Sequence, residues 1–378
     1  MKAVVLSGGG SKGSYQIGVW KAIKKLHIKY DIVTGTSVGA INGALMIQKN
    51  YHKAINLWKK INMKLLFGED ATESNKISDI FNMYRNNFLE NGGMDVSNLE
   101  TIITKSINKK NFYDSKIKFG LVTVNASEKK AVQLTKDQIP SEDLTDYLIA
   151  SASCYPAFQT KDINGDKYID GGFFDNLPIN LAIDLGADEI IAVDLEAPGL
   201  KVKPKKKVNT ITIKPNNKLT NFLHFYEEGA KRNIKFGYND TMKVFNKYLG
   251  NKYTFYKFGF NKTISEIEEI FLYNFANIIN TNKLNKIFDL DIFDPEKLIL
   301  KISEEIGLLY NLDETKIYFY KSYNKKLLKT FKHDTNNETI KVLFNKMVER
   351  DYKYLRIKGI LNPKEFIYAL YLYTINEV

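Results

Sequence analysis

Gly35-Thr36-Ser37-Val38-Gly39 stands between the apolar pair Ile32-Val33 and a segment of small and apolar residues, 40–47. The pattern G-x-S-x-G between a strand and a helix is typical of a nucleophile elbow, in which only glycine fits on either side of a sharp turn. The serine hydroxyl then lies at the start of a helix, where amides and the helix dipole favour negative charge. Glycine and serine also form ordinary turns, so the pentapeptide alone leaves both interpretations open.

A glycine-rich segment, Gly8 to Gly13, precedes this elbow and follows the short apolar run 2–6. Apolar residues then recur every three positions over 17–26, which predicts a helix. A strand, a glycine loop and a helix in this order direct backbone N–H groups at an anion. Because one such unit separates the two motifs, we expect the loop and the elbow on adjacent strands. The early position of Ser37 also excludes the α/β-hydrolase fold, in which several strands precede the elbow.

Asp170-Gly171-Gly172 is the third glycine-bearing segment, and it ends the predicted strand 167–169. A carboxylate at the edge of a parallel sheet lies where ligands bind, although Asp-Gly is also a common turn. Histidine is the usual general base in acyl transfer. None of the four histidines lies in a glycine turn or ends a convincing strand; they are His27, His52, His224 and His333. Asp170 is therefore the candidate partner of Ser37, with the plain turn as the alternative.

Predicted strands and helices alternate over residues 2–213, which is typical of a mostly parallel sheet with helices on both faces. The expected fold class is a three-layer α/β domain. Residues 51–98 are predicted to be helical and to cover the site, with Leu57, Trp58, Ile61 and Leu65 as their apolar face.

Two domains are expected. A catalytic domain spans 1–255, with its core motifs in 1–200 and a basic extension in 201–250. A helix-rich region of undetermined role follows in 256–378. Two helices in this region are expected to begin at Asp294-Pro295 and Asn362-Pro363, where a capping residue precedes proline. Asn362 and Glu365 also have the spacing of a capping box.

The 378-residue chain is 44% hydrophobic and 26% charged, which is a globular composition. Cys154 is its single cysteine, so no disulfide forms within this sequence and a reducing compartment is favoured. Neither the N-terminal apolar run nor the stretch 366–375 is long enough for a signal peptide or a membrane span. The resulting expectation is a cytoplasmic protein, with peripheral membrane binding as a further option.

The net charge of +12 comes entirely from the second half of the chain. Residues 1–200 contain 23 basic and 23 acidic side chains, whereas residues 201–250 contain 12 and 3. Such a surface favours a polyanionic partner, either anionic lipid or nucleic acid, although a solvated lysine-rich surface is the plainer explanation. Phe222, Phe225 and Tyr226 have helical spacing and are expected in a core, so nucleic acid is not the expected partner.

Together these motifs resemble the three ordered motifs of the patatin-like phospholipase family. The resemblance is good over about 1–200 and looser to about 250, and it includes the segments 151–158 and 176–178. Two residues depart from the family pattern: Ser7 stands where plant members have aspartate, and Lys12 where arginine is common.

The resemblance implies a lipid acyl hydrolase with a Ser37–Asp170 dyad and no histidine. Asp170 would accept the proton of Ser37, an acyl-enzyme would form on Ser37, and the Gly8, Gly9 and Gly10 loop would stabilise the oxyanion. The supporting motif residues would be Lys12, Gly13, Gly35, Gly39, Gly171 and Gly172. It further implies a phospholipid or other lipid ester as substrate and no metal or other cofactor. Together with this substrate class, the positive charge of residues 201–250 predicts membrane contact through that basic surface.

Two other functions stay open. Gly8 to Gly13 also fits the dinucleotide fingerprint G-x-G-x-x-G, which needs an acidic residue at the end of the second strand. Asp31 has nearly the required spacing but precedes that strand, and a P-loop fails because Ser14 follows Gly13. A non-catalytic lipid-binding module is the other alternative, against which the presence of both Ser37 and Asp170 argues.

Overall fold

The computed structural model describes residues 1–68, 71, 74, 76–278 and 294–378. These form two compact units, Met1–Val244 and Phe245–Val378, which are described separately. Parts of two predicted helical segments, residues 69–70, 72–73, 75 and 279–293, lie outside the described residues. Within the described part of the chain, no helix combines the length and the hydropathy that a membrane span requires.

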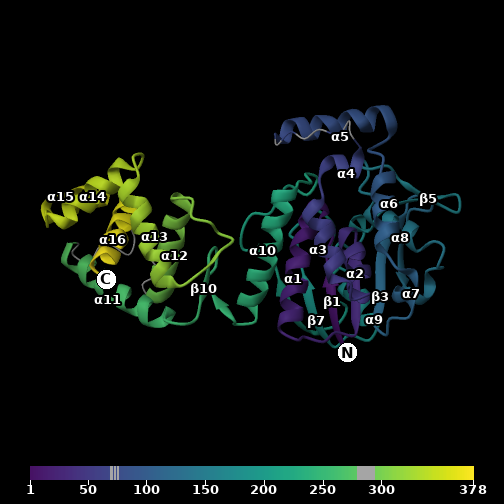
Figure 1. The fold of residues 1–378 in the computed structure, drawn as a ribbon, viewed down its shortest axis with the longest axis horizontal. Coiled ribbons are helices and arrows are strands. Elements are labelled where there is room, and N and C mark those ends of the chain that lie inside the picture. Colours follow the sequence, from purple (N-terminus) through teal and green to yellow (C-terminus); the bar gives the residue numbers. More distant parts are fainter. Residues whose placement is uncertain (69–70, 72–73, 75, 279–293) are drawn as a thin grey trace. The chain divides into compact units, whose positions relative to one another are not determined.

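The first unit is built on an eight-stranded sheet in the order β5-β6-β3-β2-β1-β7-β8, with β4 paired to β3 (Figure 1). Five strands are parallel: β1 (Lys2–Leu6), β2 (Ile32–Thr36), β3 (Lys118–Asn125), β7 (Glu189–Val193) and β8 (Asn209–Ile213). The other three join on the β3 side through antiparallel pairs: β4 (Lys130–Thr135) and β6 (Asp166–Asp170) each pair with β3, and β5 (Lys161–Ile163) pairs with β6. The predicted mostly parallel sheet is confirmed.

Helices cover both faces of this sheet, as a buried parallel sheet requires. The short helix α9 (Ile179–Asp184) packs on the face that carries Ala3, Val5 and Ile32. On the other face lies α2 (Val38–Ile47), where a Cβ at Gly43 would touch Val33 and Phe119. The remaining helices before α9 are α1 (Ser14–Lys25), α3 (Tyr51–Lys60), α4 (Met63–Phe67), α5 (Ile77–Asn91), α6 (Ser97–Ser106), α7 (Lys109–Tyr113) and α8 (Leu144–Ala152). The predicted three-layer arrangement is therefore confirmed.

The last helix of this unit, α10 (Glu227–Val244), packs closely against α1. A Cβ at Gly18 would lie 2.0 Å from the carbonyl oxygen of Ile234, and one at Gly237 would lie 2.0 Å from that of Tyr15. Two glycines that face each other's helix backbone allow this approach. Residues 198–207 form a linker without helix or strand, and the chain that follows it completes the first unit.

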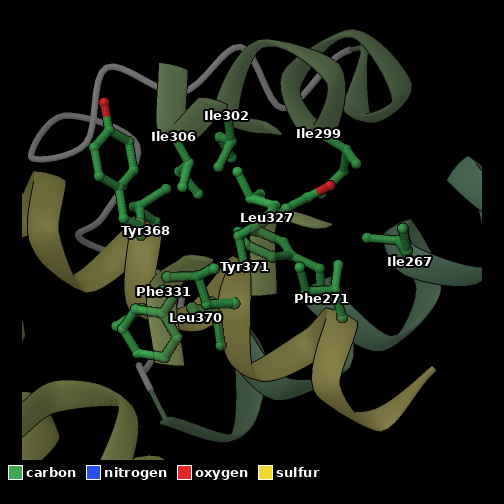
Figure 2. Close-up of a cluster of buried hydrophobic side chains, with 14 of the residues drawn as sticks. Ile267, Phe271, Ile299, Ile302, Ile306, Leu327, Phe331, Tyr368, Leu370 and Tyr371 are labelled. Carbon is green, nitrogen blue, oxygen red and sulfur yellow. The ribbon is translucent and has the colours of Figure 1, made fainter. Parts of the chain in front are cut away.

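The second unit is a helical bundle with a small sheet of β9 (Tyr248–Leu249), β10 (Thr254–Tyr256) and β11 (Ile317–Tyr318). Its helices are α11 (Phe260–Ile278), α12 (Pro295–Leu309), α13 (Tyr320–His333), α14 (Glu338–Val348), α15 (Tyr352–Leu361) and α16 (Pro363–Glu377). Figure 2 shows side chains of α11, α12, α13 and α16 meeting in its core. The predicted helix-rich C-terminal region is confirmed.

Both predicted helices begin at their proline, Pro295 and Pro363, but their capping residues differ in their hydrogen bonds. The Asp294 side chain accepts a hydrogen bond from the Lys297 amide at 3.1 Å, as expected for a cap before Pro295. Asn362 forms no such bond, and the predicted capping box is wrong. Because α15 ends at Leu361, the Asn362 side chain donates instead to the Lys358 carbonyl at 3.1 Å.

Candidate active site

Ser37 occupies a sharp turn between β2 and α2. Its backbone has φ 56° and ψ −130°, a region that costs a non-glycine residue about 1–3 kcal/mol. A Cβ at Gly35 would lie 2.3 Å from the Gly39 carbonyl oxygen, and one at Gly39 would lie 2.3 Å from the Leu6 carbonyl oxygen. Both glycines are thus sterically required, as in a nucleophile elbow.

Hydrogen bonds from neighbouring elements hold this turn. The Ser37 amide donates to Ser151 Oγ at 2.8 Å, and Ser151 Oγ donates to the Val122 carbonyl at 2.7 Å. Thr36 Oγ1 donates to the Asp175 carbonyl at 2.7 Å. The elbow is therefore tied both to strand β3 and to the loop that follows Asp170.

Asp170 lies at the end of β6, directly opposite Thr123 of β3. Its carboxylate lies next to the Ser37 side chain and accepts from the Gly172 amide at 2.7 Å. Burial raises the pKa of Asp170 to about 6, while the neighbouring Ser37 side chain and the bond from Gly172 lower this pKa. Gly171 must lack a side chain, because a Cβ there would lie 2.1 Å from the Val122 carbonyl oxygen.

The glycine loop passes beside Ser37, since a Cβ at Gly8 would lie 3.0 Å from the Ser37 Cβ. The Gly8 amide is already engaged: it donates to both the carbonyl oxygen and Oδ1 of Asn176, each at 3.1 Å. The Gly9 and Gly10 amides find no acceptor among the described residues. Gly10 also has φ 52° and lies against the Phe222 carbonyl, so only glycine fits.

Lys12 lies on the outer side of this loop. Its ammonium group donates to the carbonyl oxygens of Leu195 and Glu196, at 3.4 and 3.1 Å. Burial lowers its pKa. Gly13 packs against the elbow helix, because a Cβ there would lie 2.4 Å from a Val38 methyl carbon. Both residues support the loop in its place.

Two cavities meet at Ser37, each also lined by Gly10 and Phe158. The first has a cavity volume of about 50 Å³ and is almost wholly apolar, with walls from Ile41, Leu57, Trp58, Ile61, Leu66, Phe67, Leu99, Ile102, Ile103 and Phe225 among others. The second has a cavity volume of about 170 Å³ and is more polar, because Asp170 and Asn176 line it. An apolar and a more polar cavity therefore share Ser37.

The segment 51–98 does supply part of the apolar wall, through Leu57, Trp58 and Ile61. The predicted fourth member of this face, Leu65, is wrong: it is exposed, and Leu66 is buried in its place. The reason is that α3 ends at Lys60 and α4 begins at Met63, so the helical periodicity does not continue across the break.

Sequence reasoning assigned no role to three buried polar side chains at this site: Ser151, Asn176 and Asp175. Asp175 accepts from the Leu177 and Val202 amides at 3.2 Å each, and burial raises its pKa to about 6. The segments of Ser151 and Asn176 belong to the family resemblance, whereas Asp175 lies just outside it. Pairing of β3 with β6, which brings these residues together, has no local signature in the sequence.

The histidines do not take part. None lines either cavity at Ser37, and within the described residues no group of three or more His, Cys, Asp or Glu side chains could hold a metal ion. Asp31 accepts from the Lys2 amide, at the opposite end of β1 and β2 from the glycine loop. The acidic residue that a dinucleotide fingerprint needs is therefore distant from that loop.

The fold and the site define a parallel-sheet α/β domain in which a serine elbow faces a buried carboxylate. Residues 4–183 match the family model "Patatin-like phospholipase". The match covers 180 of the 378 residues, and this part of the chain is similar to the patatin-like phospholipase family.

Several curated proteins are similar to this region. Patatin-like phospholipase domain-containing protein 7 of Rattus norvegicus is 27% identical over 194 residues, which cover 51% of this chain and 13% of that protein. Lysophospholipase NTE1 of Chaetomium globosum is 30% identical over 209 residues, 51% of this chain and 12% of that protein. The match thus spans about an eighth of the length of these relatives. VipD from Legionella pneumophila has a TM-score of 0.42 at 13% identity, covering 99% of this chain and 90% of that one.

Proposed function

We propose that the protein is a metal-independent serine hydrolase of lipid carboxylic esters, of the phospholipase A or lysophospholipase type, with Ser37 as nucleophile and Asp170 as general base. The observation that carries this proposal is the buried Ser37–Asp170 pair at the junction of an apolar and a polar cavity. The similarity to the patatin-like family and to lysophospholipases supports lipid esters as the substrate class.

In the proposed reaction, Ser37 Oγ attacks the ester carbonyl carbon while its proton passes to Asp170. The Gly9 and Gly10 amides stabilise the oxyanion, since the Gly8 amide is engaged by Asn176. Collapse of the tetrahedral intermediate releases the alcohol, which takes the proton from Asp170, and leaves an acyl-enzyme. Water, deprotonated by Asp170, then attacks this ester and releases the fatty acid. One lost oxyanion donor typically costs about 3 kcal/mol of transition-state stabilisation.

The raised pKa of Asp170 supports its role as a base. An ordinary aspartate with a pKa near 4 is a weak base for an alcohol, whereas a pKa of about 6 increases its proton affinity and still leaves it ionised at pH 7. The apolar cavity would hold the acyl chain, and the polar cavity would hold the glycerol and headgroup side of the ester.

Membrane contact through the basic residues 201–250, at a cytoplasmic membrane surface, is the second part of the proposal. Several lysines of this segment form ion pairs, for example Lys201 with Asp194 and Lys231 with Glu227. Lys203, Lys206 and Lys207 are exposed in the linker. Each lysine near an anionic bilayer contributes about 1 kcal/mol, so the part of the binding that comes from this segment should require anionic lipid and weaken with salt.

A fluorophosphonate probe on the wild type, Ser37→Ala and Asp170→Asn tests the proposed site. The wild type should be labelled and should hydrolyse a lysophospholipid in the presence of EDTA. Ser37→Ala should not be labelled, and Asp170→Asn should be labelled far more slowly. Persistent labelling of Ser37→Ala would exclude Ser37 as the nucleophile, and loss of activity with EDTA would exclude a metal-independent reaction.

A further inference from the structure

Helix α5 presents an apolar outer face to solvent. Phe81 and Leu89 are 66% and 68% exposed, and Ile77, one turn before Phe81, is 65% exposed. These positions recur on one side of the helix, because residues four and eight apart share a face. The helix lies beyond the carboxyl ends of the strands, at the far side of the unit from the N-terminus (Figure 1).

The inner side of α5, which carries Tyr84, packs on the walls of the Ser37 cavities. The Tyr84 ring contacts the rings of Phe67 and Phe158, with centroids 6.2 and 6.1 Å apart, and its hydroxyl donates to the Leu223 carbonyl at 2.9 Å. Phe158 lines both cavities. One helix therefore contacts a residue that lines both cavities and also carries exposed apolar side chains.

The exposed apolar surface continues from α5 toward the site. The ring of Phe88 packs edge-on against Tyr155, which is itself exposed and follows the cavity residue Cys154. Phe173, next to Gly172 at the polar cavity, is 49% exposed. Contiguous apolar patches are rarely exposed on monomeric proteins, and where they occur they mark interaction surfaces.

We propose that this surface, formed by Ile77, Phe81, Phe88, Leu89, Tyr155 and Phe173, docks on the apolar zone of a lipid surface. The choice of a lipid rests on the proposed function: the surface adjoins the cavity that would receive an acyl chain. The charges of α5, Asp79, Arg85 and Glu90, nearly balance, so electrostatic attraction does not explain the face. Binding through this apolar surface should depend little on salt or on anionic lipid. Binding through the basic residues 201–250 should depend on both.

Co-sedimentation of the full chain with neutral phosphatidylcholine vesicles at high salt tests this surface, with Ser37→Ala as the parent so that no lipid is hydrolysed. Adding Phe81→Ser and Leu89→Ser should weaken binding about tenfold or more, because each buried apolar side chain contributes about 1.5–3 kcal/mol. Phe258→Ser, which removes an 86% exposed phenylalanine outside this surface, is the matched control and should bind as the parent does.

Equal binding of the α5 variant and the control would overturn the docking surface. A wild-type dimer that becomes a monomer on Phe81→Ser and Leu89→Ser would also overturn it, by showing that a second copy covers the face. Because binding is measured without catalysis, these outcomes are independent of whether Ser37 proves to be the nucleophile.

A second, independent observation concerns Ser151, which is fully buried on α8. Its hydroxyl donates to the Val122 carbonyl, so its oxygen faces the Ser37 amide as an acceptor. The residue after Val122 on β3 is Thr123, the register partner of Asp170. The Ser151 hydroxyl thus links the Ser37 amide to strand β3, and β3 pairs with the strand that carries Asp170.

We infer that Ser151 is a positioning residue that holds the Thr36–Ser37 peptide in its strained orientation, which again rests on Ser37 as the nucleophile. Removing its hydroxyl leaves a buried amide without an acceptor, a change usually worth 1–3 kcal/mol or about fivefold to 150-fold. Ser151→Ala should therefore lower kcat and the rate of fluorophosphonate labelling roughly tenfold or more. The KM should change less than about twofold, since Ser151 does not line either cavity.

Two variants separate positioning from general destabilisation. Ser151→Thr keeps the hydroxyl and should recover most of the labelling rate. Ser303→Ala in the second unit removes a buried hydroxyl that donates to the Leu300 carbonyl of its own helix, and should lower the Tm without changing labelling. A folded Ser151→Ala protein that is labelled at the wild-type rate would overturn the role of Ser151, whereas labelling of Ser37→Ala would overturn the nucleophile itself.

Discussion

The two units bury polar side chains in contrasting ways. In the first unit, Ser37 and Asp170 are buried beside cavities, with a strained backbone at the serine and a raised pKa at the carboxyl. In the second, Tyr371 and Tyr320 are buried within a dense apolar core, where they bond to each other and to Asn324. Buried polar groups that line a cavity can reach a bound substrate. Buried polar groups whose hydrogen bonds are all made within a core stabilise one arrangement of its side chains.

The largest expected effect is on catalysis, in the first unit alone. Ser37→Ala and Asp170→Asn should each lower kcat/KM by at least about 10³-fold, since loss of one member of a catalytic unit removes most of its contribution. Both proteins should unfold at or above the wild-type Tm. Substantial activity in either variant would show that catalysis does not depend on the Ser37–Asp170 pair of the first unit.

Gly39→Ala should disrupt the first unit selectively. A Cβ 2.3 Å from the Leu6 carbonyl oxygen forces β1 and α2 apart, and we expect a loss above about 4 kcal/mol of unfolding free energy. Gly259→Ala is the control in the second unit, where no heavy atom lies within 4 Å of the new Cβ although φ is +71°. Limited proteolysis should degrade the first unit of Gly39→Ala. Degradation to the same extent in the control would argue against a local clash.

The raised pKa of Asp170 predicts opposite trends for activity and stability. Activity needs the carboxylate, so kcat/KM should rise with pH through about 6. The folded state binds the proton more tightly than the unfolded chain, so stability from Asp170 is present below pH 4 and is lost as pH rises through 6. The loss is about 3 kcal/mol, from a pKa difference of about two units.

Asp170→Asn isolates this contribution. The variant should be more stable than the wild type at pH 7 and should lose the advantage at pH 4, measured by urea unfolding at both values. A wild-type stability that rises between pH 4 and 6 relative to Asp170→Asn would show that the carboxyl is not destabilised by burial.

A smaller effect is expected in the second unit. Tyr371→Phe removes the hydrogen bond to Asn324 at 2.8 Å and the bond to Tyr320 at 3.1 Å. The cost should be about 1–2 kcal/mol of stability with no change in kcat/KM. Reduced activity in this variant, at a temperature where it is folded, would show that the second unit influences catalysis.

The smallest effect concerns the surface of the basic segment. Lys231→Ala breaks the ion pair with Glu227, which spans one helical turn of α10. Exposed pairs of this kind contribute about 0.3–0.5 kcal/mol, and thermal unfolding in low and high salt should show no larger change. A loss above 1 kcal/mol would indicate that this segment is part of the first unit's core rather than its surface.

The sequence allowed the sheet and the elbow to be predicted because their signals are local. Apolar runs mark the buried strands, and Gly35 and Gly39 flank Ser37 within five residues. The pairing of Asp170 with Ser37 needed the family resemblance, since 133 positions separate them and β6 joins the sheet antiparallel beside β3. The roles of Ser151 and Asn176 could not be predicted, because the residues that flank a serine or an asparagine do not show which distant groups its side chain will bond. The exposed face of α5 was missed for a similar reason: burial of a helix face depends on distant partners.

The close contact of α1 with α10 has a consequence for dissecting the chain. The family match ends at residue 183, yet β7 and β8 extend the sheet beyond β1, and Gly237 fits against the backbone of α1. A fragment cut at the end of the family match would leave β1 as an open edge and expose the inner side of α1. The shortest piece able to fold as this α/β unit therefore ends near Val244, where the first compact unit ends.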